Sequence, residues 1–272
     1  MRDHFFTVFS RLPSGLRGFV YKHFYQFMAG TYRRQDWKFM NYGFAPLSGQ
    51  DSRLNLDAKD EENRLYIQLY NHLASSLDLE GLDVLEVGCG RGGGAEFIAR
   101  YLHPSRMVGL DLSRNVIEFC TQVYDLDGLS FETGDAQALP FVEESFDVLI
   151  NVESSHCYGC MGDFLGEVHR VLRRGGTFLL ADFRRVEALD ELRSTLLGSG
   201  LALVEEKDIT PNILKALDMD HPRRTSFIKD TVPRPLIGLA HQFAGTSGTT
   251  INKRLRMGET VYSSFVMRKM AD

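Results

Sequence analysis

The sequence predicts an α/β protein with a doubly wound, mostly parallel sheet, and three observations lead to this prediction. Strand-like apolar segments alternate with helix-like segments from about residue 81 to about residue 206, a pattern that places helices on both faces of a parallel sheet. The first strand ends near Glu86, directly before a glycine-rich turn. A second strand ends in another acid, Asp111, 25 positions later.

The glycine-rich turn is the most informative of these features. Residues 84–94 read Val-Leu-Glu-Val-Gly-Cys-Gly-Arg-Gly-Gly-Gly. Glycine is needed where the backbone takes a positive φ or passes close to a ligand, and the helix that follows offers unpaired N–H groups. Because Gly88, Gly90 and Gly93 also fit the pattern of dinucleotide enzymes, this turn alone predicts a nucleotide site without choosing the nucleotide.

The remaining strands place polar residues at the same edge of the sheet. They are expected at residues 107–112, 129–133, 145–151, 171–180 and 259–267. Doubly wound folds bind ligands at the carboxyl ends of their strands, and the acid that ends the second strand binds ribose hydroxyls. Asp111 is therefore the ribose candidate, while Asp135 follows the third strand and Asn151 ends the fourth.

Length, composition and charge restrict the class of protein. A chain of 272 residues with 43% apolar residues is most simply one α/β domain with an insertion. Its formal net charge of -5 argues against a general affinity for nucleic acid. No apolar run approaches the roughly 18 to 20 residues of a membrane span, and the basic N-terminus has no signal-like apolar core. We expect a cytoplasmic protein.

Cysteine usage predicts a reduced interior without a metal site. The four cysteines are too few and too scattered for a disulfide framework. Cys157 and Cys160 form a C-x-x-C pattern beside His156, which leaves metal or redox chemistry as an alternative. Structural zinc needs four converging ligands, and no second pair is present. We therefore expect small apolar side chains that line a loop.

Residues 1–40 form a separate segment in the predicted organisation, ahead of a main domain at 41–272. The segment carries seven Lys or Arg against two acids, and its aromatic residues recur at steps of three and four, which favours helix. Three functional interpretations remain open: a lid over the active site, a contact between subunits of a homo-oligomer, and a helix at a membrane surface. The fourth interpretation is a helix that packs on the domain.

Two further regions frame the alternating core. A helix is predicted from near Asp57 to Leu73. Between about 208 and 257 the pattern changes to helical pieces, interrupted by Pro211, Pro222, Pro233 and Pro235. This excursion is longer than a connection needs to be, so we predict that it recognises the substrate.

The series of motifs resembles the class I methyltransferases that use S-adenosyl-L-methionine. The sequence Glu-Val-Gly-Cys-Gly after a strand is the form typical of that class rather than of dehydrogenases. The resemblance implies a Rossmann-like sheet of seven mostly parallel strands, with N-terminal helices and a helical insertion before the last strand. It also implies S-adenosyl-L-methionine as the cofactor.

Each part of this cofactor has a candidate partner. The main chain around Gly88 and Gly90 can approach the amino-acid end, and Asp111 can accept two hydrogen bonds from the ribose diol. The resemblance implies that Asp135 binds the adenine amino group. The alternative for both acids is a solvated carboxylate or a helix cap. The complete set of cofactor candidates is Tyr42, Glu86, Gly88, Cys89, Gly90, Asp111, Leu112, Asp135, Ala136 and Asn151.

A hydroxyl nucleophile must lose its proton as the methyl group is transferred, so a base is required near the fourth strand. His156 lies on the loop after that strand, and a neutral imidazole can accept the proton at pH 7. The alternative for His156 is a buried structural histidine. Glu153 is the second catalytic candidate, either to orient His156 or to contact the cofactor amino group. Weaker candidates are Tyr158, Tyr42, Tyr21 and His241.

A closer resemblance is carried by residues 60–70, 85–95, 102–113, 128–158 and 164–184. These segments look like those of the phthiotriol/phenolphthiotriol dimycocerosates methyltransferases and related bacterial enzymes that O-methylate polyketide-derived lipids. The resemblance implies O-methylation of a hydroxyl on a hydrophobic polyketide, lipid or other secondary metabolite. The first alternative is C-methylation of a prenyl or sterol-like alkene, with or without cyclisation, where aromatic side chains would stabilise a cation. The second is a non-catalytic module that binds S-adenosyl-L-methionine.

Overall fold

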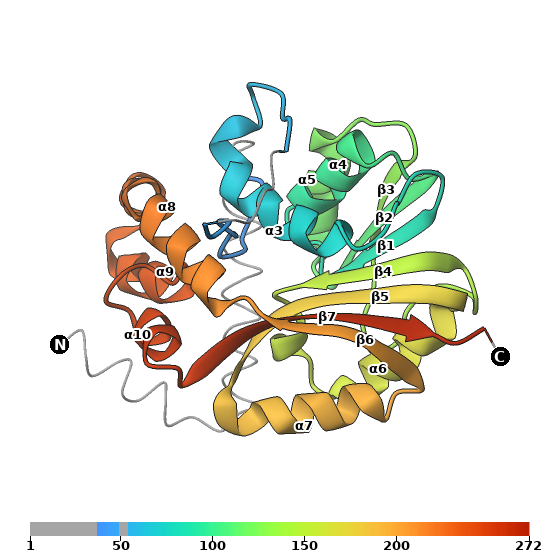
Figure 1. Ribbon diagram of the computed structural model, residues 1–272. Helices are drawn as coiled ribbons and strands as arrows, with labels where there is room; N and C mark the ends of the chain where they lie inside the picture. Colours follow the sequence, from blue (N-terminus) through green and yellow to red (C-terminus); the bar gives the residue numbers. More distant parts are fainter. Residues whose placement is uncertain (1–36, 49–53, 272) are drawn as a thin grey trace.

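The computed structural model describes residues 37–48 and 54–271, which form one seven-stranded sheet in the order β3-β2-β1-β4-β5-β7-β6 (Figure 1). The strands are β1 Asp83–Val87, β2 Arg106–Asp111, β3 Leu129–Thr133, β4 Phe146–Val152, β5 Leu172–Arg185, β6 Leu201–Asp208 and β7 Thr260–Lys269. Strands β1 to β5 pair in parallel. Strand β7 lies antiparallel between β5 and β6. The predicted doubly wound, mostly parallel sheet is confirmed.

Helices cover both faces of this sheet. In Figure 1, α3, α4 and α5 lie on one side and α6 and α7 on the other. The helices are η1 Glu61–Asn63, α3 Arg64–Ala74, α4 Gly93–Tyr101, α5 Arg114–Val123, η2 Ser155–Cys157, α6 Met161–Val171, α7 Val186–Leu197, α8 Thr210–Thr231, η3 Arg234–Leu236, α9 Ile237–Phe243 and α10 Thr250–Arg256. None of the helices within the described ranges has the length and apolarity needed to cross a membrane.

The central strands are apolar because both of their faces are buried. Val84 of β1 packs with Ile67 of α3 and Phe97 of α4 in one core cluster. Its neighbour Leu85 points to the opposite face and packs with Leu165 of α6 in a second cluster. Each fully buried aliphatic side chain of this kind stabilises the fold by about 1.5–3 kcal/mol. The two cores hold the sheet between its two layers of helices. The candidate site lies outside these cores, at the carboxyl edge of the strands.

Two expectations about helices need correction. The helix predicted from near Asp57 starts with the short η1, and its α-helical part begins only at Arg64. Pro222 does not interrupt α8, which runs for 22 residues through it. Proline removes one backbone hydrogen bond from a helix interior, but distant residues hold this part of α8 in place: Asp220 accepts from the Tyr66 hydroxyl, and Arg224 donates to the Asn41 carbonyl. The predicted N-terminal helices fall within residues 1–36, outside the described residues.

Candidate active site

The carboxyl ends of β1, β2, β4 and β5 meet at one edge of the sheet, and the glycine-rich turn between β1 and α4 lies there. Gly88 and Gly90 have φ angles of 77° and 52°, which glycine adopts without strain. The backbone N–H groups of Gly88 and Cys89 donate to the Leu110 carbonyl at 2.7 and 3.0 Å. A Cβ on Gly88 would lie only 2.3 Å from Ser154 Oγ. The turn is therefore held tightly between β2 and the loop that follows β4.

Two buried side chains beside this turn each keep an unpaired acceptor atom. Glu86 Oε1 accepts a 2.7 Å hydrogen bond from Tyr70, and Asn151 Nδ2 donates to the Val87 carbonyl at 2.9 Å. In contrast, Glu86 Oε2 and Asn151 Oδ1 are buried without a well-formed hydrogen bond to any described residue. Burial raises the pKa of Glu86 to about 8, although hydrogen bonds from the Tyr70 hydroxyl and from the Ala95 backbone lower it. Unpaired buried acceptors are costly, so this position fits a ligand group that carries donors.

Asp111 ends β2 and is buried against the glycine-rich turn. Its Oδ2 accepts from the Gly90 N–H at 3.1 Å, and its Oδ1 accepts from the Ser113 N–H at 2.9 Å. Each carboxylate oxygen can accept a further hydrogen bond. Leu112 beside it is 44% exposed and offers an apolar surface. The geometry therefore fixes the direction of the Asp111 carboxylate through two backbone contacts.

Asp135 is held differently, because it is exposed and lies in a turn after β3. Its Oδ1 accepts from the Gln137 N–H at 2.9 Å, while the neighbouring Ala136 is buried. Gln137 in turn accepts at Oε1 from the Cys160 N–H at 2.6 Å. This hydrogen bond ties the turn to the loop after β4, so the two candidate acids lie along one continuous edge.

Glu153 has a backbone conformation that is rare for its residue type. Its φ is 48°, in the left-handed region that costs a non-glycine residue about 1–2 kcal/mol. Its N–H donates to the Ala181 carbonyl at 2.9 Å. Its Oε1 accepts from the Tyr42 N–H at 2.7 Å and from the Tyr262 hydroxyl at 2.9 Å. Burial raises the pKa of Glu153 to about 7, although both hydrogen bonds lower it. Glu153 therefore anchors Tyr42, and no described hydrogen bond joins it to His156.

Asp182, near the end of β5, orients His156. The His156 ring Nδ1 lies 2.8 Å from Asp182 Oδ1, and the His156 N–H donates to Oδ2 at 2.9 Å. Oδ2 also accepts from the Ser155 hydroxyl at 2.6 Å and lies 3.0 Å from Arg184 Nη1. Because a carboxylate can only accept from Nδ1, the proton is assigned to Nδ1, which leaves Nε2 as the acceptor nitrogen.

The opposite charges of His156 and Asp182 shift the pKa of both groups. Burial lowers the pKa of His156, but the Asp182 carboxylate raises it by more, so the pKa lies well above that of a free imidazole. Burial raises the pKa of Asp182, but His156 and Arg184 lower it by more, so the pKa lies below its ordinary value. The pair is therefore a carboxylate beside a histidine of increased basicity.

The weaker candidates lie in different places. The Tyr158 hydroxyl lies 2.9 Å from both Asn151 Nδ2 and Ser154 Oγ, so it belongs to the network under the glycine-rich turn. His241 of α9 lies 3.0 Å from Thr246 within the insertion and has no described contact with His156. Tyr21 lies outside the described residues. Among the residues that the structure describes, no group of three His, Cys, Asp or Glu could hold a metal ion.

Three residues of this site are not among the candidates that the sequence predicts. Tyr70 binds Glu86, Tyr262 binds Glu153, and Asp182 binds His156. A signal existed for Asp182, because it lies toward the carboxyl end of β5, at the same edge as the other acids. Tyr70 and Tyr262 carry no such signal, since a tyrosine within an apolar helix or strand is usually a core residue.

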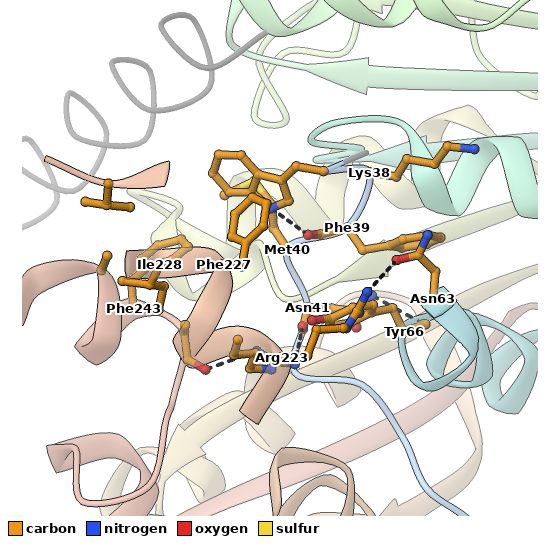
Figure 2. Close-up of a pocket in the computed structure, with 15 residues that line it drawn as sticks. Lys38, Phe39, Met40, Asn41, Asn63, Tyr66, Arg223, Phe227, Ile228 and Phe243 are labelled. Carbon is orange, nitrogen blue, oxygen red and sulfur yellow. Dashed lines mark hydrogen bonds between the residues drawn. The ribbon is translucent and has the colours of Figure 1, made fainter. Parts of the chain in front are cut away.

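An apolar cavity lies beside this edge, between residues 37–41, α3, α8 and α9 (Figure 2). Its empty volume is about 890 Å³, which includes space open to solvent. Asn41 lies on its wall, directly before Tyr42, whose N–H binds Glu153. The cavity and the candidate active site are therefore adjacent in the chain, because Asn41 lines the cavity and the next residue, Tyr42, contacts Glu153.

Comparison with known proteins gives consistent matches over most of the chain. A sequence model of the methyltransferase domain matches residues 85–180. A phthiotriol/phenolphthiotriol dimycocerosates methyltransferase of Mycobacterium tuberculosis is 36% identical over 92% of this chain and 92% of the relative. A fatty-acid O-methyltransferase of Mycolicibacterium smegmatis is 35% identical over 91% of this chain and 89% of the relative.

Solved structures share the fold at lower sequence identity. The geranyl diphosphate C-methyltransferase of Streptomyces coelicolor, in complex with Mg²⁺, geranyl diphosphate and S-adenosyl-L-homocysteine, matches with a TM-score of 0.63. The match covers 90% of this chain and 98% of that chain at 18% identity.

Proposed function

The chain belongs to the phthiotriol/phenolphthiotriol dimycocerosates methyltransferase family and is an S-adenosyl-L-methionine-dependent methyltransferase; from this premise we propose that it methylates a hydroxyl oxygen of a hydrophobic lipid or polyketide-derived acceptor. The alternative of a non-catalytic binding module is not supported, since the relatives over most of the chain are methyltransferases. The observation that carries the choice of oxygen is the pairing of His156 with Asp182.

The residues at the glycine-rich turn fit the cofactor. Its ammonium group carries donors, and the buried Glu86 Oε2 and Asn151 Oδ1 both lack a well-formed hydrogen bond to a described residue. Because Gly88 carries no Cβ, Ser154 packs directly against the turn, and in this proposal the main chain of the turn approaches the amino-acid end of the cofactor. In this proposal Asp111 accepts from the ribose diol and Asp135 from the adenine amino group. When bound, S-adenosyl-L-methionine supplies an electrophilic methyl group and leaves as S-adenosyl-L-homocysteine.

His156 acts as the general base in this proposal. Its Nε2 accepts the hydroxyl proton while the oxygen attacks, and the buried Asp182 carboxylate stabilises the imidazolium that forms. His156 must be neutral to do this. Because its pKa is raised, the enzyme reaches its full rate only above the pH at which an ordinary histidine loses its proton.

Glu153 is a positioning residue in the same proposal. Its carboxylate holds the Tyr42 N–H and the Tyr262 hydroxyl, and the Tyr42 ring stacks on Phe183 at 5.6 Å between ring centroids. The Phe183 ring lies 4.4 Å from the His156 ring. Glu153 therefore fixes the aromatic wall beside the base.

The substrate-recognition role of residues 208–257 is supported by the cavity, since α8 and α9 line it.

The test is to locate the transferred methyl group. Acceptor extracts are incubated with the enzyme and isotopically labelled S-adenosyl-L-methionine, and the labelled product is analysed by mass spectrometry and NMR. The proposal is supported if the label is found on oxygen and if His156→Ala no longer releases S-adenosyl-L-homocysteine in the presence of the acceptor. Label on carbon would favour C-methylation instead.

A further inference from the structure

We infer that the cavity binds the hydrocarbon chain of an amphiphilic acceptor, and that Arg223 pairs with a carboxylate on the same molecule. The inference deepens the proposed function and rests on it, because it names the chemical class of the acceptor. It is carried by the composition of the two walls of the cavity, which differ sharply.

One wall is apolar. It is formed by the side chains of Trp37, Phe39 and Met40 together with apolar side chains of α8 and α9, of which Phe227, Ile228 and Phe243 are the largest. Trp37 and Phe227 pack together with their ring centroids 5.7 Å apart. Such a surface binds a hydrocarbon chain because the contact removes apolar area from water.

The other wall carries one positive charge in excess. Arg223 and Arg224 both line the cavity, and both donate through Nε to the same carboxylate, Asp220, at 2.9 and 2.7 Å. Asp220 also accepts from the Tyr66 hydroxyl. Lys38 also lines the cavity, but its Nζ pairs with Glu96 at 2.7 Å. The two guanidinium groups and one carboxylate of the Arg223 cluster leave a net charge of one, which a monoanion would neutralise. A carboxylate is a monoanion at pH 7, whereas a phosphate monoester carries nearly two charges.

Arg223 is the member of this cluster with donors to spare. Arg224 is 7% exposed, and its Nη groups donate to the carbonyls of Ala244, Asn41 and Tyr42. The Arg223 side chain is 42% exposed. Its Nη1 lies 3.5 Å from Asn63 Oδ1, and its guanidinium lies 5.0 Å from the Tyr66 ring centroid and also hydrogen-bonds with the Tyr66 side chain. A guanidinium carries five N–H donors, so these contacts and the one to Asp220 leave donors available. The two Nη groups of a guanidinium form the edge that a carboxylate pairs with through parallel hydrogen bonds.

The carboxylate bound there is not the reacting group. His156, Asp182 and Glu153 do not line the cavity. The cavity and the base are linked by packed residues, since Arg224 donates to the Tyr42 carbonyl, the Tyr42 ring stacks on Phe183, and the Phe183 ring lies 4.4 Å from the His156 ring. The acceptor in this inference therefore carries a hydroxyl for methylation and a separate carboxylate for recognition.

The single tryptophan of the chain makes the binding step measurable without turnover. Trp37 lines the cavity, so a brominated chain bound there quenches its fluorescence. The probes are 9,10-dibromostearic acid and its methyl ester, added to the full-length protein below their aggregation concentrations. We expect both to quench, with the acid binding about tenfold more tightly than the ester.

Arg223→Gln should remove this preference for the acid and leave ester binding unchanged, and Arg223→Lys should restore part of it. The matched control is Arg193→Gln. Arg193 has a side chain of the same 42% exposure and pairs with an aspartate three residues earlier, as Arg223 does, but it lies on α7 and does not line the cavity. In turnover, Arg223→Gln should raise the acceptor KM and leave kcat unchanged.

Equal affinity of the wild-type protein for acid and ester would overturn the role of Arg223, and this comparison does not depend on how any variant folds. An absence of quenching by both probes would overturn the assignment of the cavity. Failure of the proposed O-methylation has a different signature, because the labelled methyl group is then found on carbon while the quenching data stay as predicted.

Discussion

The proposed cofactor side and the proposed acceptor side of the candidate active site are built in different ways. The cofactor side is a backbone structure, in which Gly88, Gly90 and Asp111 lie at the ends of adjacent strands and are joined by main-chain N–H groups. The acceptor side is assembled from side chains. Arg224 and the Asn41 carbonyl are 183 positions apart, and Tyr66 and Asp220 are 154 positions apart. A local motif can therefore specify the first but not the second.

This difference separates two kinds of specificity. A turn made of backbone atoms recognises a constant ligand, since few side-chain substitutions alter it. A cavity made of side chains from α3, α8, α9 and residues 37–41 can change its ligand by substitution at several independent positions. The family relationship thus identifies the cofactor directly, whereas in our proposal the acceptor depends on residues such as Arg223.

The largest expected effect is on the base, at the border of the two sides. His156→Ala should lower turnover by roughly two to four orders of magnitude, because the whole contribution of general-base catalysis is lost. Affinity for S-adenosyl-L-homocysteine should remain nearly unchanged, as measured by calorimetric titration. A variant within a few-fold of wild-type activity would assign His156 a structural role.

Removal of residues 1–36 tests the predicted lid on the acceptor side. If the segment covers the cavity, the shortened protein should still bind S-adenosyl-L-homocysteine but turn over the acceptor roughly tenfold or more slowly, since water exclusion and alignment are lost. Loss of folding, seen as a collapsed thermal midpoint, would favour a packing role. A changed mass in light scattering would indicate a subunit contact.

Asp111→Ala tests the cofactor side. The ribose diol loses its acceptor, which should weaken binding of S-adenosyl-L-homocysteine by about 1–3 kcal/mol. Asp111→Asn keeps an acceptor oxygen and serves as the conservative control. Asp135 is exposed, so Asp135→Ala should weaken the binding of S-adenosyl-L-homocysteine by less than Asp111→Ala does. A larger loss of affinity in Asp135→Ala would contradict the assignment of Asp111 to the ribose diol.

A smaller expected effect is a shift in the pH dependence of kcat/KM, which tests whether Asp182 sets the pKa of His156. Because the pKa of His156 is raised and the neutral form is the active one, the rate should rise with pH through a midpoint above about 6.5. Asp182→Asn removes the negative charge, so the midpoint should move to lower pH while the maximal rate falls. A midpoint that does not move would exclude Asp182 as the partner that sets this titration.

The same contrast explains what the sequence predicts and what it does not. The strand that ends before Gly88, and the acid that ends β2, follow from local patterns of burial and glycine placement, so their positions are predicted correctly. The continuity of α8 through Pro222 is not predictable in this way, because contacts with distant residues outweigh the local cost of proline. The pairing of Asp182 with His156 needs the register of β5 against β4, which no local pattern contains.

The proposed cofactor and acceptor sides should bind their ligands independently. The test measures the affinity for S-adenosyl-L-homocysteine by calorimetry and the affinity for 9,10-dibromostearic acid by Trp37 quenching, in the wild-type protein, in Asp111→Ala and in Arg223→Gln. We expect Asp111→Ala to weaken only the binding of S-adenosyl-L-homocysteine and Arg223→Gln to weaken only the binding of the brominated acid. If either variant weakens the binding of both ligands to a similar extent, the two sides are not separate binding units.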